Sequence, residues 1–122
     1  MYCCTSSASL SCSLQALPEE HLEALMRTVS LIIVHCSANK AGSALRAEDI
    51  DRYHRSLGWK CCGYHYVIPT DGTIEAGRPE ELVGAHCKHH NSHSIGICYI
   101  GGLDDGGTTP KDTRTEAQKA TL

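Results

Sequence analysis

The sequence predicts an α/β fold, in which a buried sheet is flanked by helices. Residues 28–36 and residues 93–102 are almost continuously apolar and rich in β-branched side chains, as expected of strands covered on both faces. Between them, residues 46–59 place apolar side chains at helical spacing. With 122 residues, the chain has the length of one domain with one hydrophobic core.

The N-terminal 25 residues predict an extension outside the domain. Residues 1–17 are rich in Ser and Cys without a clear period, so we expect them to be poorly ordered. Pro18 and the following EEHLEALM predict a short helix, because Pro suits a first turn and acidic side chains favour a helix N-terminus. The single domain is then expected to occupy residues 26–122.

The run TVSLIIVHC, residues 28–36, predicts a central strand that ends in His35 and Cys36. Neighbouring side chains on a strand point to opposite faces. If His35 faces a cleft at the strand end, Cys36 must therefore face the interior as a core residue. Residues 37–45 predict a loop.

The stretch RAEDIDRYHRSLGW, residues 46–59, predicts an amphipathic helix. Gly58 is expected to end it, because Gly readily takes the left-handed conformation that terminates helices. The side chains at helical spacing, and hence on the expected apolar face, are Ile50, Tyr53, His54 and Leu57.

The stretch CGYHYVIPTDGTIEAGR predicts a β-hairpin. Its first strand is expected over residues 64–68 and its second over residues 73–76, joined by a tight turn at Asp71-Gly72. Alternation would place Tyr64, Tyr66 and Ile68 on one face and His65 and Val67 on the other.

The last segments predict a second buried strand and a helix. HSIGICYIGG, residues 93–102, predicts the strand, which ends at a turn at Gly101-Gly102. After a Gly- and Asp-rich loop, residues 113–122 have the composition of a helix, with Thr113 or Thr115 as its N-cap. Its only apolar anchors are Ala117, Ala120 and Leu122, which is weak support for a short helix, so we expect that the chain has been cut within it.

Composition and charge narrow the classes of partner. The chain carries 11 Lys and Arg against 14 Asp and Glu, a net charge of -3, so nucleic acid is not expected as a partner. No run approaches the roughly 20 apolar residues that span a bilayer, so no membrane span is expected. The 8 Cys include adjacent pairs and no secretory signal precedes them, so we expect reduced thiols and a protein that is cytoplasmic at synthesis.

The histidines leave several interpretations of the chemistry open. His35 ends a buried strand, where side chains of α/β folds commonly enter a cleft, whereas His21 and His54 are interpreted as structural. The run AHCKHHNSH, residues 85–93, could form a local metal site, although it completes none of the usual zinc-ligand spacings. A nucleophile pair of Cys36 and His35 is disfavoured, because strand neighbours point to opposite faces.

An ordered series of motifs resembles a known family. VHCSA follows the first predicted strand, GW closes the helix, and GYHYVIPTDGTIEAGRPEELVGAH and NSHSIGICYIGGLDD come next in that order. The series resembles the phage lysozyme-type N-acetylmuramoyl-L-alanine amidases, relatives of the peptidoglycan recognition proteins, from residue 27 onward. It is similar in particular to prophage-type amidases of gut bacteria, whose chains begin at a Met-Arg-Thr like that at Met26.

This resemblance implies a mixed sheet with helices packed on it, and a zinc hydrolase. Members of the family cleave the amide between the lactyl group of N-acetylmuramic acid and the L-alanine of the peptide stem. Their zinc ion, held by two His and a third Cys or Asp ligand, lowers the pKa of a bound water to about 7, and this water attacks the carbonyl. The implied partner is peptidoglycan or its muropeptides, and the protein is expected to act on the cell wall as a monomer.

Individual residues can be matched to the family motifs. His35 in VHCSA matches the first zinc ligand. Tyr64 in GYHY matches the catalytic tyrosine, which orients the zinc-bound water or stabilises the developing oxyanion. Cys98 and the Cys61-Cys62 pair match no functional position. The residues that match or flank the substrate groove are Trp59, His65, His86 and Asn91.

The chain also departs from the family pattern. In the family, the second His ligand, a catalytic Lys and the third ligand come from a C-terminal stretch, but no His or Cys follows Ile100 here. The resemblance therefore implies a domain without the C-terminal strand and helix, with an incomplete Zn²⁺ site and no activity by this chain alone. Two alternatives stay open: a non-catalytic muropeptide-binding domain, and a His-rich interaction loop at residues 86–93.

Overall fold

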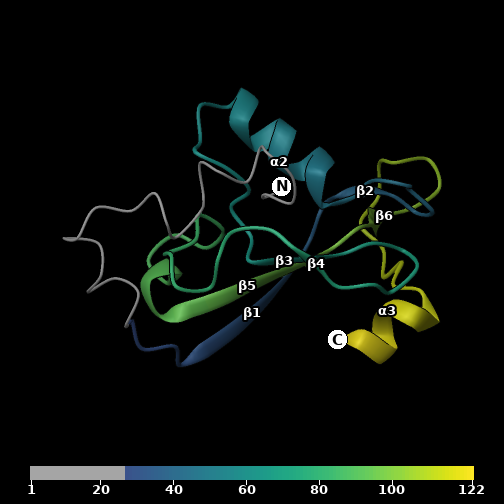
Figure 1. The fold of residues 1–122 in the computed structure, drawn as a ribbon. Helices are drawn as coiled ribbons and strands as arrows, with labels where there is room; N and C mark the ends of the chain where they lie inside the picture. Colours follow the sequence, from purple (N-terminus) through teal and green to yellow (C-terminus); the bar gives the residue numbers. More distant parts are fainter. Residues whose placement is uncertain (1–26) are drawn as a thin grey trace.

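The computed structural model describes residues 27–122, shown in colour in Figure 1. The predicted extension of residues 1–25, with its short helix, lies outside the described residues. The elements are β1 (Leu31–Cys36), β2 (Asn39–Lys40), α2 (Ala47–Ser56), β3 (Tyr66–Ile68), β4 (Glu75–Ala76), the 3₁₀ helix η4 (Asn91–His93), β5 (Ser94–Tyr99), β6 (Gly102–Leu103) and α3 (Glu116–Thr121). None of the helices in this part of the chain is long and apolar enough to cross a membrane.

The main sheet is mixed and has the strand order β1-β5-β3-β4. β5 runs parallel to both β1 and β3, and β4 is antiparallel to β3. A small parallel pair, β2 with β6, continues the paths of β1 and β5 in two segments that the sequence predicts as loops. The predicted α/β class, with a mixed sheet flanked by helices, is confirmed (Figure 1).

The predicted position of β1 at the centre of the sheet is wrong, because β5 occupies that place. Among the strands of residues 27–122, β1 lies at the edge, with Ile32 67% exposed and Val34 50% exposed. Cys36, which alternation places on the same face of β1, is also exposed rather than in the core. An apolar run shows that a segment suits a strand, but the strand's place in the sheet depends on which partners pair with it.

The core lies between the sheet and α2. Ala47 and Ile50 of α2 pack with Val67 of β3 and with Ile100, which follows β5. The Cys61-Cys62 pair completes this cluster, with relative exposures of 1% and 0%. Cys62 is free, but Cys61 is disulfide-bonded, so the expectation of reduced thiols is wrong at Cys61.

The face of α2 that is buried differs from the predicted one. Ile50 and His54 are buried as expected, but Tyr53 is 61% exposed and Leu57 is 52% exposed. The buried face of α2 also includes Asp51. Its carboxylate accepts a 2.7 Å hydrogen bond from the Cys62 N–H and forms an ion pair with Arg55. Because its charge is paired and hydrogen-bonded, Asp51 can take a core position that hydrophobicity alone would not assign to it.

The predicted hairpin is present, with shorter strands. Gly72 has a φ of 83° and closes the turn by donating its N–H to the Pro69 carbonyl at 2.9 Å. Tyr64 precedes the first strand and packs against the core cluster, whereas Tyr66 and Ile68 lie on the opposite, Ile32-bearing face. The prediction that Tyr64 shares a face with Tyr66 is therefore wrong, because strict alternation begins only where the strand does.

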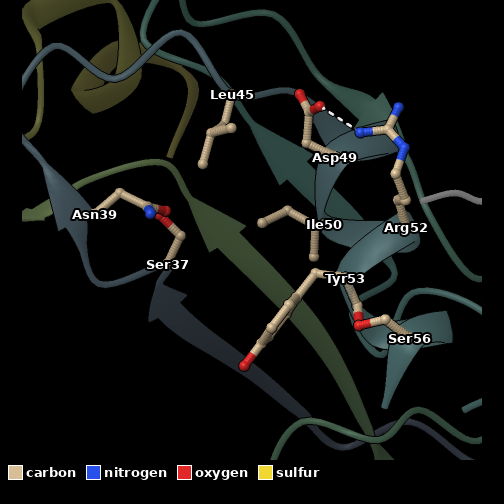
Figure 2. Close-up of a pocket in the computed structure, with 8 residues that line it drawn as sticks. All are labelled: Ser37, Asn39, Leu45, Asp49, Ile50, Arg52, Tyr53 and Ser56. Carbon is tan, nitrogen blue, oxygen red and sulfur yellow. Dashed lines mark hydrogen bonds and ion pairs between the residues drawn. The ribbon is translucent and has the colours of Figure 1, made fainter. Parts of the chain in front are cut away.

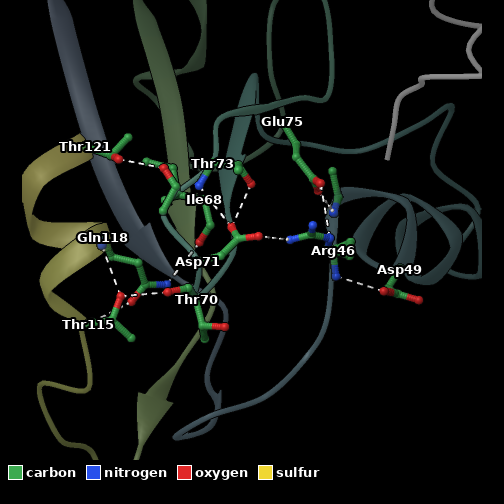
Figure 3. Close-up of polar contacts among 12 residues, drawn as sticks. Arg46, Asp49, Ile68, Thr70, Asp71, Thr73, Glu75, Thr115, Gln118 and Thr121 are labelled. Carbon is green, nitrogen blue, oxygen red and sulfur yellow. Dashed lines mark hydrogen bonds and ion pairs between the residues drawn. The ribbon is translucent and has the colours of Figure 1, made fainter.

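α3 has the predicted N-cap but a different anchor. Thr115 accepts a hydrogen bond from the Gln118 N–H, as a capping box requires. The predicted apolar anchors Ala117, Ala120 and Leu122 are all exposed. Gln118 is fully buried instead, and its Nε2 donates to the Ile68 and Ile100 carbonyls at 3.1 Å each. Figure 3 shows Gln118 beside Ile68. A polar side chain thus fixes this helix to the ends of two strands.

Candidate active site

Three side chains from separate segments meet on the α2 side of the sheet. His35, near the C-terminal end of β1, has its ring centroid 5.4 Å from that of Tyr64 and 5.0 Å from that of His86. The strand register sets this position, because it aligns His35 with Cys98 of β5 and Cys98 with Val67 of β3, whose side chain packs against α2. The fold therefore brings together the predicted zinc ligand, the predicted catalytic tyrosine and one predicted groove residue.

His86 connects His35 to the start of β5. His35 Nε2 lies 2.9 Å from His86 Nδ1, and His86 Nε2 lies 3.3 Å from Ser94 Oγ. Ser94 Oγ in turn donates to the His90 carbonyl at 2.7 Å. Ser94 was not among the predicted site residues, although alternation could have indicated it, because it shares a face of β5 with Gly96 and Cys98.

Burial keeps the central side chains uncharged. It lowers the pKa of His35, and it lowers the pKa of His86 to about 4, with the neighbouring His35 and His65 acting in the same direction. It raises the pKa of Tyr64 far above its ordinary value, because the phenolate would lose its hydration. At neutral pH the site therefore presents neutral imidazoles and a phenol that can donate a hydrogen bond.

Trp59 and His54 extend the ring cluster toward solvent. The His54 ring lies 5.7 Å from Tyr64 and 4.4 Å from Trp59, centroid to centroid. His54 is buried and its Nδ1 accepts a 2.9 Å hydrogen bond from the Gly63 N–H, in agreement with a structural role. Trp59 is 40% exposed, so its ring offers an apolar surface at the rim of the site.

His65 and Asn91 are occupied within the protein. His65 is 1% exposed, its Nδ1 accepts from the Gly96 N–H at 3.0 Å and its Nε2 lies 2.8 Å from the Leu82 carbonyl. Asn91 Oδ1 accepts from the N–H groups of His86 and Cys87, both at 2.9 Å. His65 thus has no exposed ring surface for a substrate, and Asn91 shapes the loop that carries His86.

Residues 27–122 do not assemble a complete metal site by themselves. In this part of the chain, no group of three or more His, Cys, Asp or Glu side chains could hold a metal ion. This includes the His-rich segment 86–93, so the alternative of a local metal site there finds no ligand cluster. Cys36 cannot assist His35, because it lies on the opposite face of β1. The described donors therefore do not fit a three-ligand zinc centre.

The chain has a match to a known protein family. The matching family is described as N-acetylmuramoyl-L-alanine amidase, and the match extends over residues 25–122. The chain belongs to this amidase family. The resemblance that the motifs indicate is confirmed, and enzymes of this family are generally zinc-dependent.

Phage endolysins are among the curated relatives of this amidase-family chain. It is 48% identical to the endolysin of Enterobacteria phage T3 over 80 residues, which are 66% of this chain and 53% of the phage protein. It is 45% identical to the endolysin of Klebsiella phage KP32 over 93 residues, which are 76% of this chain and 61% of that protein. The chain thus spans little more than half the length of these relatives.

Solved structures support the same fold. The amidase LysC from Clostridium intestinale URNW is 29% identical with a TM-score of 0.66, and the match covers 80% of this chain and 59% of that one. Drosophila PGRP-LB is 28% identical with a TM-score of 0.58, over 77% of this chain and 58% of that one. The mixed sheet with flanking helices is therefore the fold of amidases and of peptidoglycan recognition proteins.

A cleft of about 640 Å³ lies between α2 and the segment that follows β1 (Figure 2). Ligands of open α/β sheets usually bind beyond the carboxyl ends of the strands, which is where this cleft lies. The exposed Tyr53 ring extends into it, and an ion pair between Asp49 and Arg52 stands at its edge. None of its lining residues was among the predicted site residues, although Ser37 belongs to the VHCSA motif. The lining residues are Ser37, Asn39, Leu45, Asp49, Ile50, Arg52, Tyr53 and Ser56.

Proposed function

We propose that this chain carries the first zinc ligand and the substrate groove of a peptidoglycan amidase that hydrolyses the lactyl-L-alanine amide. The observation that carries the proposal is the placement of His35 and Tyr64 against each other near the carboxyl end of β1, beside the cleft. Membership of the amidase family supports the reaction class. The substrate class follows from that reaction, and the place of action would be the cell wall, reached from the cytoplasm by a monomer.

Each of the central residues has a distinct proposed role. His35 would supply one imidazole to Zn²⁺, which when bound polarises a carbonyl and activates water. Tyr64, kept protonated by burial, would donate a hydrogen bond to the substrate oxygen that gains negative charge. The exposed face of Trp59 would contact the sugar or peptide at the rim. His86 and Asn91 would form the wall of the groove, whereas the buried His65 is not proposed as a substrate contact.

We also propose that residues 1–122 alone are not an active amidase. Zinc affinity depends on several ligands that are placed before the ion arrives, and the described residues offer no set of three. The purified chain should therefore release no soluble peptide stems from peptidoglycan. Release that a chelator abolishes would overturn this part of the proposal.

A chimera tests the reaction itself. It appends to residue 122 the part of the phage T3 endolysin that lies beyond its match to this chain. The chimera should release peptide stems in a chelator-sensitive reaction, and His35→Ala should abolish release, whereas His89→Ala, a substitution in the neighbouring His-rich segment, should not. A soluble, folded chimera without activity, or one that His35→Ala leaves fully active, would contradict the proposal.

The alternative function is binding of muropeptides without cleavage. The observation that favours it is that Tyr64, Trp59 and the cleft are in place in residues 27–122, although a three-ligand metal set is not. Retention of the purified chain on insoluble peptidoglycan tests this function. Trp59→Ala should reduce retention, whereas Ile74→Ala, a similarly apolar and exposed residue near the opposite sheet face, should not. No retention of the unaltered chain would exclude this alternative.

A further inference from the structure

We infer that Ser94 and His86 are positioning residues that hold His35 with its proton on Nε2 and leave Nδ1 as its basic nitrogen. The inference concerns the direction of three linked hydrogen bonds, from His35 through His86 and Ser94 to a backbone carbonyl. It rests on the proposed function only for the use of that free nitrogen.

The donor and acceptor roles in these three hydrogen bonds are set by the last one, between Ser94 and the His90 carbonyl. Ser94 Oγ lies 2.7 Å from the His90 carbonyl oxygen, which can only accept, so the one hydroxyl proton of Ser94 is used there. Toward His86 Nε2, at 3.3 Å, Ser94 Oγ can then only accept. His86 must therefore carry its proton on Nε2, and its Nδ1 holds a lone pair.

The same argument passes from His86 to His35. His86 Nδ1 and His35 Nε2 are 2.9 Å apart, and one of them must donate. Because His86 Nδ1 holds the lone pair, His35 Nε2 is the donor. The opposite direction would leave the lone pairs of His86 Nε2 and Ser94 Oγ facing each other, which is repulsive. His35 Nδ1 consequently holds the lone pair of the neutral ring.

Packing holds the His86 ring in the orientation that the hydrogen bonds to His35 and Ser94 require. A Cβ on Gly96 would lie 2.5 Å from two carbons of the ring, and one on Gly84 would lie 2.7 Å from Cδ2. The ring thus lies close against the backbones of two glycines. The Asn91 side chain fixes the backbone N–H of His86 at 2.9 Å. Such tight seating suits a residue that orients a neighbour, as the outer partners of metal-binding histidines do.

The test reads the tautomer of His35 directly. An isotope-labelled sample of the whole chain, without added metal and above the ordinary His pKa of about 6.5, is examined by long-range proton–nitrogen correlation spectroscopy. The expected result is a protonated Nε2 and an unprotonated Nδ1 on His35, with a detectable, exchange-protected Nε2 proton. A proton on Nδ1 of His35 would overturn the inference, whatever the behaviour of any variant.

Variants separate positioning from simple packing. His86→Ala and Ser94→Ala should abolish the protected Nε2 proton signal of His35, and Ser92→Ala, an exposed serine nearby, should leave it unchanged. His86→Asn should restore the signal, because its carboxamide oxygen stands near the place of Nδ1 and can accept. A signal that persists in folded His86→Ala would contradict the inference. These spectra require neither zinc nor substrate, so failure here is distinct from failure of the chimera to cleave peptidoglycan.

Discussion

The rings of His35 and Tyr64 lie 5.4 Å apart, centroid to centroid, although their segments are not neighbours in the sheet. β5 runs between β1 and β3, and its residue in the shared row is the fully buried Cys98. The contact therefore spans the width of a strand, which is feasible because the side chains of β5 on this face are small. The site consequently depends on Ser94, Gly96 and Cys98 as much as on the rings themselves.

Gly96→Ala should destabilise the fold and displace His86. The new Cβ would lie 2.5 Å from ring carbons of His86, so the ring or β5 must move, at a cost of about 1–3 kcal/mol in the free energy of unfolding. Urea unfolding measures this change. Gly106→Ala is the control, because its nearest neighbouring atom would be 3.5 Å away. Equal stabilities of the two variants would show that His86 is not held as described.

Tyr64→Phe should slow the chimera with the phage T3 endolysin without weakening its retention on peptidoglycan. Loss of one hydrogen-bond donor to a developing oxyanion typically costs about 10²-fold in rate. The measurement compares the rate of peptide release with retention on insoluble peptidoglycan. Tyr66→Phe serves as the control, because its hydroxyl bonds Glu80 at the other face of the sheet. Equal rates for both variants would remove Tyr64 from the catalytic role.

Gln118→Leu should lower the free energy of unfolding by about 2–3 kcal/mol, although it places an apolar side chain at a buried position. It removes the donor to the Ile100 and Ile68 carbonyls, and the Ile100 carbonyl is left buried without it. Lys119→Ala removes only an exposed 3.4 Å ion pair with Glu116 and should change stability by less than about 0.5 kcal/mol. Thermal or urea unfolding decides, and a Gln118→Leu variant as stable as the parent would refute the anchoring role.

His54 should make the fold acid-sensitive. Burial, with Arg78 nearby, lowers its pKa from 6.5 to about 4, so the unfolded chain binds a proton before the folded one does. The stabilising contribution is therefore fully present above about pH 6.5 and falls as the pH drops toward 4, by roughly 2 kcal/mol. His54→Gln keeps an acceptor for the Gly63 N–H and should reduce the loss of unfolding free energy between these pH values. An unchanged pH profile would contradict this assignment.

Several elements could be predicted because their signals are local. The Asp71-Gly72 turn determines the hairpin through a positive φ at Gly72, and Thr115 marks the start of α3 through its capping box. The place of β1 could not be predicted, because it depends on pairing between distant segments. The buried stripe of α2 was misjudged because Asp51 is buried only by virtue of its partners.

In the candidate site, too, some residues are indicated by local sequence motifs and others depend on the three-dimensional arrangement. The motifs single out His35 and Tyr64 as candidates, and the structure shows only that their rings lie close together. The contribution of Ser94 depends on where a loop carbonyl lies in space, which no local pattern specifies. The lining of the cleft likewise depends on the rotation of α2, which turns Tyr53 outward.

The exposed position of β1 also bears on how the protein behaves in concentrated solution. Within residues 27–122, β1 has no strand at its outer edge, and its uncovered face carries Ile32 and Val34. Unpaired backbone groups beside exposed branched side chains are a template on which further chains can add as strands. Colloidal solubility, rather than the folding equilibrium, should then limit the usable concentration of this chain, and a lysine in place of Ile32 should raise that limit.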